Sequence, residues 1–189
     1  MTNLLITGAS RGIGFELAQP ALTMGWRVFG SVRSREDAFR VLGELGLSES
    51  GRDLRMAEEG LPGFTPLIFD VTDHAAVRAA VVGLDVSIDI LINNAGNYRK
   101  GSGLKTDIVA LQSSFNVNLF APWWLIQSFM KQLPPEKEGK IVNICDAGIF
   151  RTASDHFAYR LTKKALYEMT RMFALELAPK ITVNALAPG

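Results

Sequence analysis

Tyr159 and Lys163 are the two residues of this sequence whose types and spacing most directly indicate chemistry. The surrounding stretch carries apolar residues at helical spacing, so residues four apart are expected on one face, one turn from each other. A neighbouring ammonium group favours phenolate over phenol, which makes the tyrosine a candidate general acid or base for carbonyl and alcohol chemistry. The alternative is a solvated helix edge, because tyrosine and lysine meet at this spacing by chance in many proteins.

The helix that carries this pair is expected to run from residue 154 to residue 178. Ser154 or Asp155 can cap its start, because their side-chain oxygens accept hydrogen bonds from first-turn N–H groups. Pro179 cannot continue the helix, because it has no N–H group to donate.

The composition predicts one globular domain. The chain has 189 residues, 48% of them hydrophobic, and its 20 basic and 19 acidic residues leave a net charge of +1. This balance provides no field that would attract nucleic acid or an anionic membrane. No apolar run reaches membrane-spanning length, the first residues do not resemble a secretory signal, and Cys145 is the single cysteine, which rules out an internal disulfide. We therefore expect a cytoplasmic protein without a metal site.

A glycine-rich segment, GASRGIG at residues 8–14, follows the first apolar run and precedes a helical pattern. In this strand–turn–helix context, Gly8 permits a tight turn, Gly12 lets the backbone approach a pyrophosphate, and Gly14 lets the helix lie close to the strand. The helix N-terminus offers free N–H groups to phosphate. The alternative is an ordinary tight turn. The dinucleotide interpretation also includes the residues between the glycines: Ser10, Arg11 and Ile13.

The residues after the second predicted strand, 26–32, bear on the choice of cofactor. An acidic residue at this place is typical of sites that bind a free ribose 2′-hydroxyl, but the chain has Arg33, Ser34 and Arg35 there. Together with Arg11, these guanidinium groups favour a 2′-phosphate and hence NADP(H) over NAD(H). The alternative is that Arg33 and Arg35 are only solvated loop charges.

Strand and helix patterns alternate along the whole chain. Six strands are predicted, and between them lie helices that include long ones at 107–132 and 154–178. Pro122 is expected to kink the first of these near Asn118. This alternation predicts an α/β fold: a single domain with a doubly wound parallel β-sheet covered by helices on both faces. Residues 47–63 are longer than a helix-to-strand connection needs and predict a surface excursion.

Several motifs together resemble the short-chain dehydrogenase/reductase family, and the resemblance covers the whole of residues 1–189. They are TGASRGIG at 7–14, Asp70-Val71, NNAG at 93–96, Asn118, YxxxK at 159–163 and the final Pro188-Gly189. The resemblance implies a Rossmann-type fold and a nicotinamide cofactor. It implies that Tyr159 is the catalytic acid, that Lys163 lowers the pKa of Tyr159 and holds the nicotinamide ribose, and that Asn118 anchors a proton-relay water. The implied cofactor site also includes Asp70, Val71, Asn94, Ala95, Gly96, Pro188 and Gly189.

Asp146 departs from the family pattern, which has a catalytic serine thirteen residues before the tyrosine. An ionised aspartate would repel a developing oxyanion and raise the pKa of the tyrosine. Three readings follow from this departure. The aspartate is protonated and donates a hydrogen bond, it binds a substrate that carries N–H groups, or the site is impaired.

The second reading agrees with a resemblance to the pteridine reductases and the dihydromonapterin or dihydrofolate reductase-like members of the family. These carry aspartate at this position and an aromatic ring soon after the NNA motif, where Tyr98 lies here; the alternative is that Tyr98 is an exposed loop aromatic. A pterin offers ring N–H and amino groups that suit a carboxylate acceptor. Tyr98, Asp146 and Tyr159 are therefore the predicted substrate-binding residues. Reductases of this subgroup often have arginine where this chain has Gly12.

The expected activity is an NADPH-dependent reduction of a C=N or C=O bond in a small molecule, with a pteridine or folate-like compound as the favoured substrate. One alternative is a carbonyl reductase for an ordinary ketone or aldehyde. Another is a cofactor-binding but impaired protein that acts through partners. Family members usually continue past the PG motif with a substrate-covering segment, which this sequence does not contain, so an uncovered sheet edge is expected. The resemblance also implies a homodimer or homotetramer that packs through the two long helices.

Overall fold

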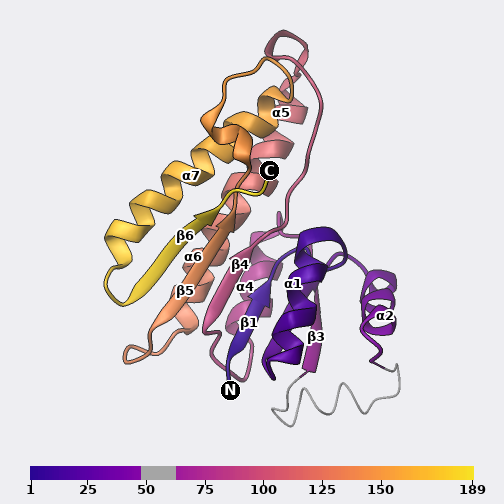
Figure 1. The fold of residues 1–189 in the computed structure, drawn as a ribbon, viewed down its shortest axis with the longest axis vertical. Helices are drawn as coiled ribbons and strands as arrows, with labels where there is room; N and C mark the ends of the chain where they lie inside the picture. The colour runs from indigo at the N-terminus through magenta and orange to yellow at the C-terminus, as the bar shows by residue number, and fades with distance from the viewer. Residues whose placement is uncertain (48–62) are drawn as a thin grey trace.

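The computed structural model describes residues 1–47 and 63–189. The surface excursion expected at 47–63 falls on residues 48–62, which lie outside the described residues. Within the described part, strands and helices alternate as the sequence predicts (Figure 1).

All six strands of the sheet are parallel, in the order β3-β2-β1-β4-β5-β6. This arrangement confirms the prediction of a Rossmann-type α/β domain. The order reverses between β1 and β4, and in such sheets ligands bind in the crevice at the carboxyl ends of the strands next to this reversal. The strands are β1 (Asn3–Ile6), β2 (Arg27–Val32), β3 (Gly63–Ile68), β4 (Ile90–Asn93), β5 (Gly139–Ile144) and β6 (Ile181–Leu186).

Helices cover both faces of the sheet, because the central strands are apolar on both sides. The helices α1 (Gly12–Thr23) and α2 (Arg35–Glu44) pack on the face that carries Leu4 and Ile6. The opposite face carries Leu5, Leu91 and Ile141. It is covered by α4 (His74–Val82), α6 (Ala121–Gln132) and α7 (Phe157–Leu177). Among the described residues, no helix is long and apolar enough to cross a bilayer.

The predicted long helix at 107–132 is divided into three parts. α5 (Ile108–Phe115) passes through one π-helical turn, η2 (Asn116–Phe120), into α6. Pro122 has no N–H group to donate to the carbonyl four residues earlier, and the Ala121 N–H bonds the carbonyl of Asn116, five residues back. The sequence predicted a kink at this place, and the structure has a π turn that contains Asn118.

The start of α7 differs from the prediction. Its N-cap is His156, which has φ +50° and no side-chain hydrogen bond to the first turn, so the expected caps Ser154 and Asp155 are wrong. Asp155 instead contacts the Nδ1 atom of His156 at 3.0 Å and the guanidinium of Arg160 at 3.2 Å. The first turn of the helix is held by the loop before it, because the Phe157 N–H donates to the carbonyl of Gly101 at 2.9 Å.

Candidate active site

Tyr159 and Lys163 lie on the same face of α7, as their spacing predicts. The Lys163 Nζ atom is 5.9 Å from the centre of the Tyr159 ring. Lys163 is buried, and its ammonium donates to the carbonyl of Ile144 at the end of β5, at 2.6 Å. Burial lowers the pKa of Lys163, because the charged form loses hydration. The backbone of the sheet therefore fixes this side chain at the carboxyl end of the strands.

Asp146 is in direct contact with Tyr159. The Tyr159 hydroxyl donates to Asp146 Oδ2 at 2.8 Å, and the Gly148 N–H donates to Asp146 Oδ1 at 2.6 Å. Burial, this hydrogen bond and the charge of Asp146 raise the pKa of Tyr159. The upward direction agrees with the effect predicted for an ionised Asp146. The lowering by Lys163 that the family resemblance implies does not prevail, because desolvation and the neighbouring carboxylate both disfavour phenolate.

Tyr98 lies against the same tyrosine. Its ring meets the Tyr159 ring edge-on at 4.7 Å between centroids, and it stacks on the His156 ring at 4.2 Å. Tyr98 is nevertheless largely exposed, with 63% of its surface accessible. The ring therefore presents an open aromatic surface beside the hydroxyl of Tyr159 and the carboxylate of Asp146.

Asn118 connects the loop after β4 with α7. Its side chain is buried in the π turn, accepts from the Asn97 N–H at 2.9 Å and donates to Thr162 Oγ1 at 3.1 Å. A π turn widens the helix and is frequent at functional sites. These contacts set the position of the segment that carries Tyr98 relative to Tyr159. The relay role that the resemblance implies for Asn118 stays a prediction.

The glycine turn has the geometry that a dinucleotide site requires. Gly8 and Gly12 have φ of +67° and +56°, and a Cβ on Gly14 would lie 2.4 Å from the Gly8 carbonyl oxygen. Asn94 ties this turn to β4, because its amide donates to the Gly8 carbonyl at 3.2 Å, while a Cβ on Gly8 would meet Ala95. No side chain caps α1, and a Cβ on Gly12 would meet no atom within 4 Å beyond its chain neighbours and the backbone of α1. The turn therefore leaves N–H groups and room for a pyrophosphate.

Arginine side chains stand around this turn. Arg11 and Arg33 are exposed, and the side chains of both form no ion pair or hydrogen bond with the part of the chain that the structure describes. Ser34 caps α2, accepting from the Asp37 N–H at 3.2 Å. Arg40, which the sequence analysis did not identify, donates to the Ser10 carbonyl at 2.9 Å. It thereby connects α2 to the glycine turn.

The remaining predicted cofactor residues lie at the same edge of the sheet or near it. Asp70 Oδ1 accepts from the N–H and the hydroxyl of Thr72, while Asp73 caps α4, as the sequence indicated. Pro188 is brought beside the catalytic loop, because its carbonyl accepts from the Ala147 N–H at 3.0 Å. Other predicted residues are placed without a polar contact of their side chains: Ile13 is exposed, Val71 is buried, Gly96 faces Asn118 and Lys163, and Gly189 lies near Ala147.

The structure thus groups the predicted residues in two places at the carboxyl ends of the strands. Tyr159, Asp146, Tyr98, Lys163 and Asn118 form the group that we call the catalytic group, whose role stays a prediction; the glycine turn with Asn94 and Ala95 forms the other. Sequence reasoning missed His156, Asn97 and Thr162. His156 and Thr162 lie three residues before and after Tyr159, so helical spacing alone could have indicated them.

Comparisons with known proteins agree with this geometry. The family model described as short chain dehydrogenase matches residues 2–189. The L-xylulose reductase of Cavia porcellus is 33% identical over 97% of this chain and 69% of the relative. The gluconate 5-dehydrogenase of Gluconobacter oxydans (strain 621H) is 33% identical over 98% of this chain and 69% of the relative.

Among solved structures, FolM alternative dihydrofolate reductase 1 from Brucella canis, crystallised with NADP, superposes with a TM-score of 0.83 and 27% identity. The alignment covers 100% of this chain and 73% of that one. The chain therefore belongs to the short-chain dehydrogenase/reductase family and is an NAD(P)-dependent oxidoreductase of small carbonyl compounds.

Proposed function

We propose that residues 1–189 form an NADPH-dependent reductase domain whose preferred substrate is a pteridine or dihydrofolate-like compound. One observation carries the proposal: the hydroxyl of Tyr159 lies on the carboxylate of Asp146 at 2.8 Å, beside the exposed ring of Tyr98. A flat heteroaromatic ring with N–H donors suits this combination of a stacking surface and a hydrogen-bond acceptor.

Two features support NADPH as the cofactor. Arg11 and Arg33 are exposed beside the glycine turn and are available for a 2′-phosphate, and the three residues directly after β2 are Arg33, Ser34 and Arg35, none of them acidic. The FolM protein that superposes on this chain was crystallised with NADP. Gly8, Ser10, Gly12, Ile13 and Gly14 would hold the pyrophosphate, with Asp70, Val71, Asn94, Ala95, Gly96, Pro188 and Gly189 around the rest of the dinucleotide.

The catalytic group supports reduction more than oxidation. When bound, NADPH would supply a hydride for the carbon of a C=N or C=O bond. Tyr159 gives its hydroxyl proton to the nitrogen or oxygen of that bond, and the phenolate then regains a proton from solvent. Tyr159 is in the phenol form in its hydrogen bond to Asp146, where its hydroxyl donates at 2.8 Å, and this protonated form is the one that a proton donor needs. Lys163 on the same face offsets the transient negative charge.

A second candidate function is the reduction of a keto-sugar or its acid. The observation that favours it is the similarity to L-xylulose reductase and gluconate 5-dehydrogenase, each 33% identical. In that case Asp146 would accept from a substrate hydroxyl. A third candidate, an impaired cofactor-binding protein, requires that Asp146 blocks turnover.

We also propose that the chain forms a homodimer or homotetramer in the cytoplasm. The apolar side chains of Ile108, Val109, Leu161, Met172 and Leu175 are exposed on α5 and α7. Surfaces of this kind pack together in oligomers.

The test is NADPH oxidation by the purified chain with dihydrobiopterin, dihydrofolate, L-xylulose and 5-keto-gluconate, followed by the variant Asp146→Ser. The proposal expects turnover of a pterin and a several-fold loss of pterin activity in Asp146→Ser. Improved pterin turnover in this variant would show that the aspartate is not a substrate ligand. Turnover of the keto-sugars alone would favour the second candidate, a keto-sugar reductase. NADPH binding without any turnover would favour the third, an impaired cofactor-binding protein.

A further inference from the structure

A cavity of about 400 Å³ lies beside the catalytic end of α7 and has a basic lining. Arg99, Lys100 and Lys105 supply three cationic side chains, and Asp107 supplies one carboxylate. Asp107 is already engaged, because it caps α5 by accepting from the Ala110 N–H at 2.7 Å. The three cations form no ion pair with any described residue, so the cavity carries an excess of positive charge.

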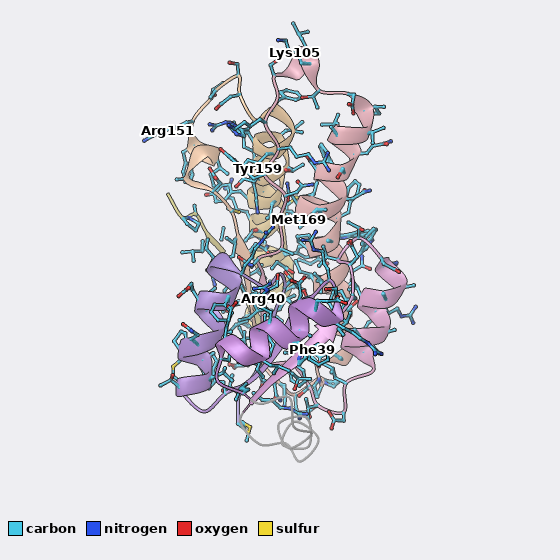
Figure 2. All side chains as sticks on the ribbon, turned by 90° about the vertical axis from the view of Figure 1, so that its right-hand side faces the viewer. Phe39, Arg40, Lys105, Arg151, Tyr159 and Met169 are labelled. Atoms are coloured by element: carbon cyan, nitrogen blue, oxygen red, sulfur yellow. The ribbon has the colours of Figure 1, made fainter. Side chains whose placement is uncertain are left out.

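The cavity is next to the reacting groups. The loop that lines it leads directly from Tyr98, whose ring is 4.7 Å from that of Tyr159, through Arg99 and Lys100 to Gly101. The Gly101 carbonyl accepts from the Phe157 N–H at the first turn of α7, and Ala158, the neighbour of Tyr159, lines the same cavity. The residues that line the cavity are thus the chain neighbours of Tyr98 and Tyr159, the two rings that contact each other at the catalytic end. Figure 2 shows Lys105 at the end of the molecule beyond Tyr159, and Arg40 on the opposite side of Tyr159.

The dipole of α7 adds a positive electrostatic potential to that of the three side chains. The helix has 21 residues and no side-chain cap, and Ala158 in its first turn lines the cavity, so the positive N-terminal end of the helix lies at the cavity. No residue of the glycine turn lines the cavity, so the phosphates of the cofactor do not account for this charge. Its volume is in the range of small-molecule sites and exceeds that of a single inorganic anion.

We propose that this cavity binds an anionic substituent of the substrate, a carboxylate or a phosphate, that is carried at some distance from the bond that is reduced. The inference deepens the proposed function, on which it rests for the position of the reacting bond at Tyr159. Within the pteridine class it selects compounds with an acidic tail, such as folates, over neutral pterins. Within the keto-sugar class it selects sugar acids over neutral ketoses.

The test measures ligand binding to the protein saturated with NADP⁺, so that no hydride transfer interferes. Folate and biopterin share the pterin ring, but only folate carries a carboxylate tail. Calorimetric titration is made with the wild type, Arg99→Gln, Lys105→Gln, the double variant, and Lys131→Gln, an exposed lysine of α6 that serves as the control for loss of one charge.

The proposal expects folate binding to weaken about threefold with each cation removed, as for exposed charge pairs, while biopterin binding and the control stay unchanged. Added salt should weaken folate binding to the wild type and have little effect on biopterin. Equal loss for both ligands, or no loss for folate in the double variant, would overturn the proposal.

The same titrations separate this inference from the proposed function. If neither pterin binds, the pteridine assignment fails, and 5-keto-gluconate and L-xylulose take their place as the anionic and neutral pair. A selective loss for 5-keto-gluconate would then support the cavity's role without pterins. If no member of either pair binds, glutarate is titrated alone, and equal affinity of the wild type and the double variant refutes the anion site.

Discussion

The cofactor end and the catalytic end of the candidate active site differ in whether backbone or side chains determine their shape. At the cofactor end, contacts are made mostly by backbone: Gly8, Gly12 and Gly14 shape the turn, and Asn94 and Arg40 donate to its carbonyls. At the catalytic end, side chains hold one another, as Asp146 holds Tyr159 and His156 holds Tyr98. The first end tolerates only glycine at particular positions, whereas the second can be rebuilt by single substitutions.

This difference explains how the chain can keep the family's cofactor turn and still depart from its catalytic pattern. A Cβ at Gly14 would collide with backbone, which cannot move away without displacing β1. At position 146, in contrast, a carboxylate takes the place of a hydroxyl while the Gly148 N–H still holds it. Substrate preference can therefore change at the catalytic end while the cofactor end stays constant.

The largest effect is expected from removal of the proton donor. Tyr159→Phe deletes one hydroxyl and leaves the stacked rings in place, so reduction should fall by about 10²–10⁴-fold, the usual contribution of general acid catalysis. NADPH affinity should remain near that of the wild type, because the cofactor end is untouched. Steady-state turnover and a fluorescence titration with NADPH measure the two quantities, and unchanged turnover would contradict the assigned role.

A substitution at the cofactor end should act on stability and binding together. Gly14→Ala places a methyl group where 2.4 Å separates it from the Gly8 carbonyl oxygen, so the turn must shift. Overpacking of this kind costs about 1–3 kcal/mol of the free energy of unfolding, and the displaced turn should bind NADPH weakly. Gly43→Ala is the matched control, since its Cβ meets nothing within 4 Å and α2 should gain about 0.5–1 kcal/mol. Thermal unfolding and NADPH titration of both variants measure the two quantities. Equal stability and equal NADPH affinity of Gly14→Ala and Gly43→Ala would show that the turn is not rigid.

The cofactor end could be predicted from the sequence more completely than the catalytic end. The parallel sheet, its helices and the glycine turn follow from apolar periodicity and from glycine positions, which are local features of the chain. The pairing of Tyr159 with Asp146 follows from the meeting of β5 with α7, and the family resemblance alone indicated it. β6 stands at the end of the strand order, and the uncovered sheet edge that the sequence led us to expect stays a prediction.

The failures have equally specific causes. The cap of α7 was assigned to Ser154 or Asp155 from residue type, but His156 in the left-handed region ends the loop, and Asp155 contacts Arg160. For the pKa of Tyr159, the sequence offered a lowering by Lys163 and a raising by an ionised Asp146, and burial adds to the effect of Asp146 in the structure. The cap was wrong and the pKa direction stayed open because local sequence does not show which groups the tertiary structure buries or brings within hydrogen-bond distance.

Removal of Arg33 should have a smaller effect, on the affinity for NADPH alone, because this arginine would contact only the 2′-phosphate. Arg33→Ala should reduce affinity for NADPH about tenfold, as expected for loss of a charge-assisted hydrogen bond, and leave affinity for NADH unchanged. Arg78→Ala, an exposed arginine of α4, is the control for loss of one positive charge. Parallel titrations with the two nucleotides measure the ratio. A similar loss for NADH would mean that Arg33 supports the fold of the turn and does not bind the 2′-phosphate.

The smallest effect is expected on the pKa of Tyr159, through the negative charge of Asp146. Asp146→Asn keeps an oxygen acceptor for the Tyr159 hydroxyl but removes the negative charge, so the pKa of Tyr159 should fall toward its ordinary value while burial still holds it up. Oxidation of the alcohol or reduced product needs the phenolate, so the rise of its kcat/KM with pH should move to lower pH in this variant. Asp73→Asn, at the cap of α4, should leave the profile unchanged. An unchanged profile in Asp146→Asn would show that desolvation alone raises the pKa of Tyr159, and that the aspartate serves the substrate without tuning the proton donor.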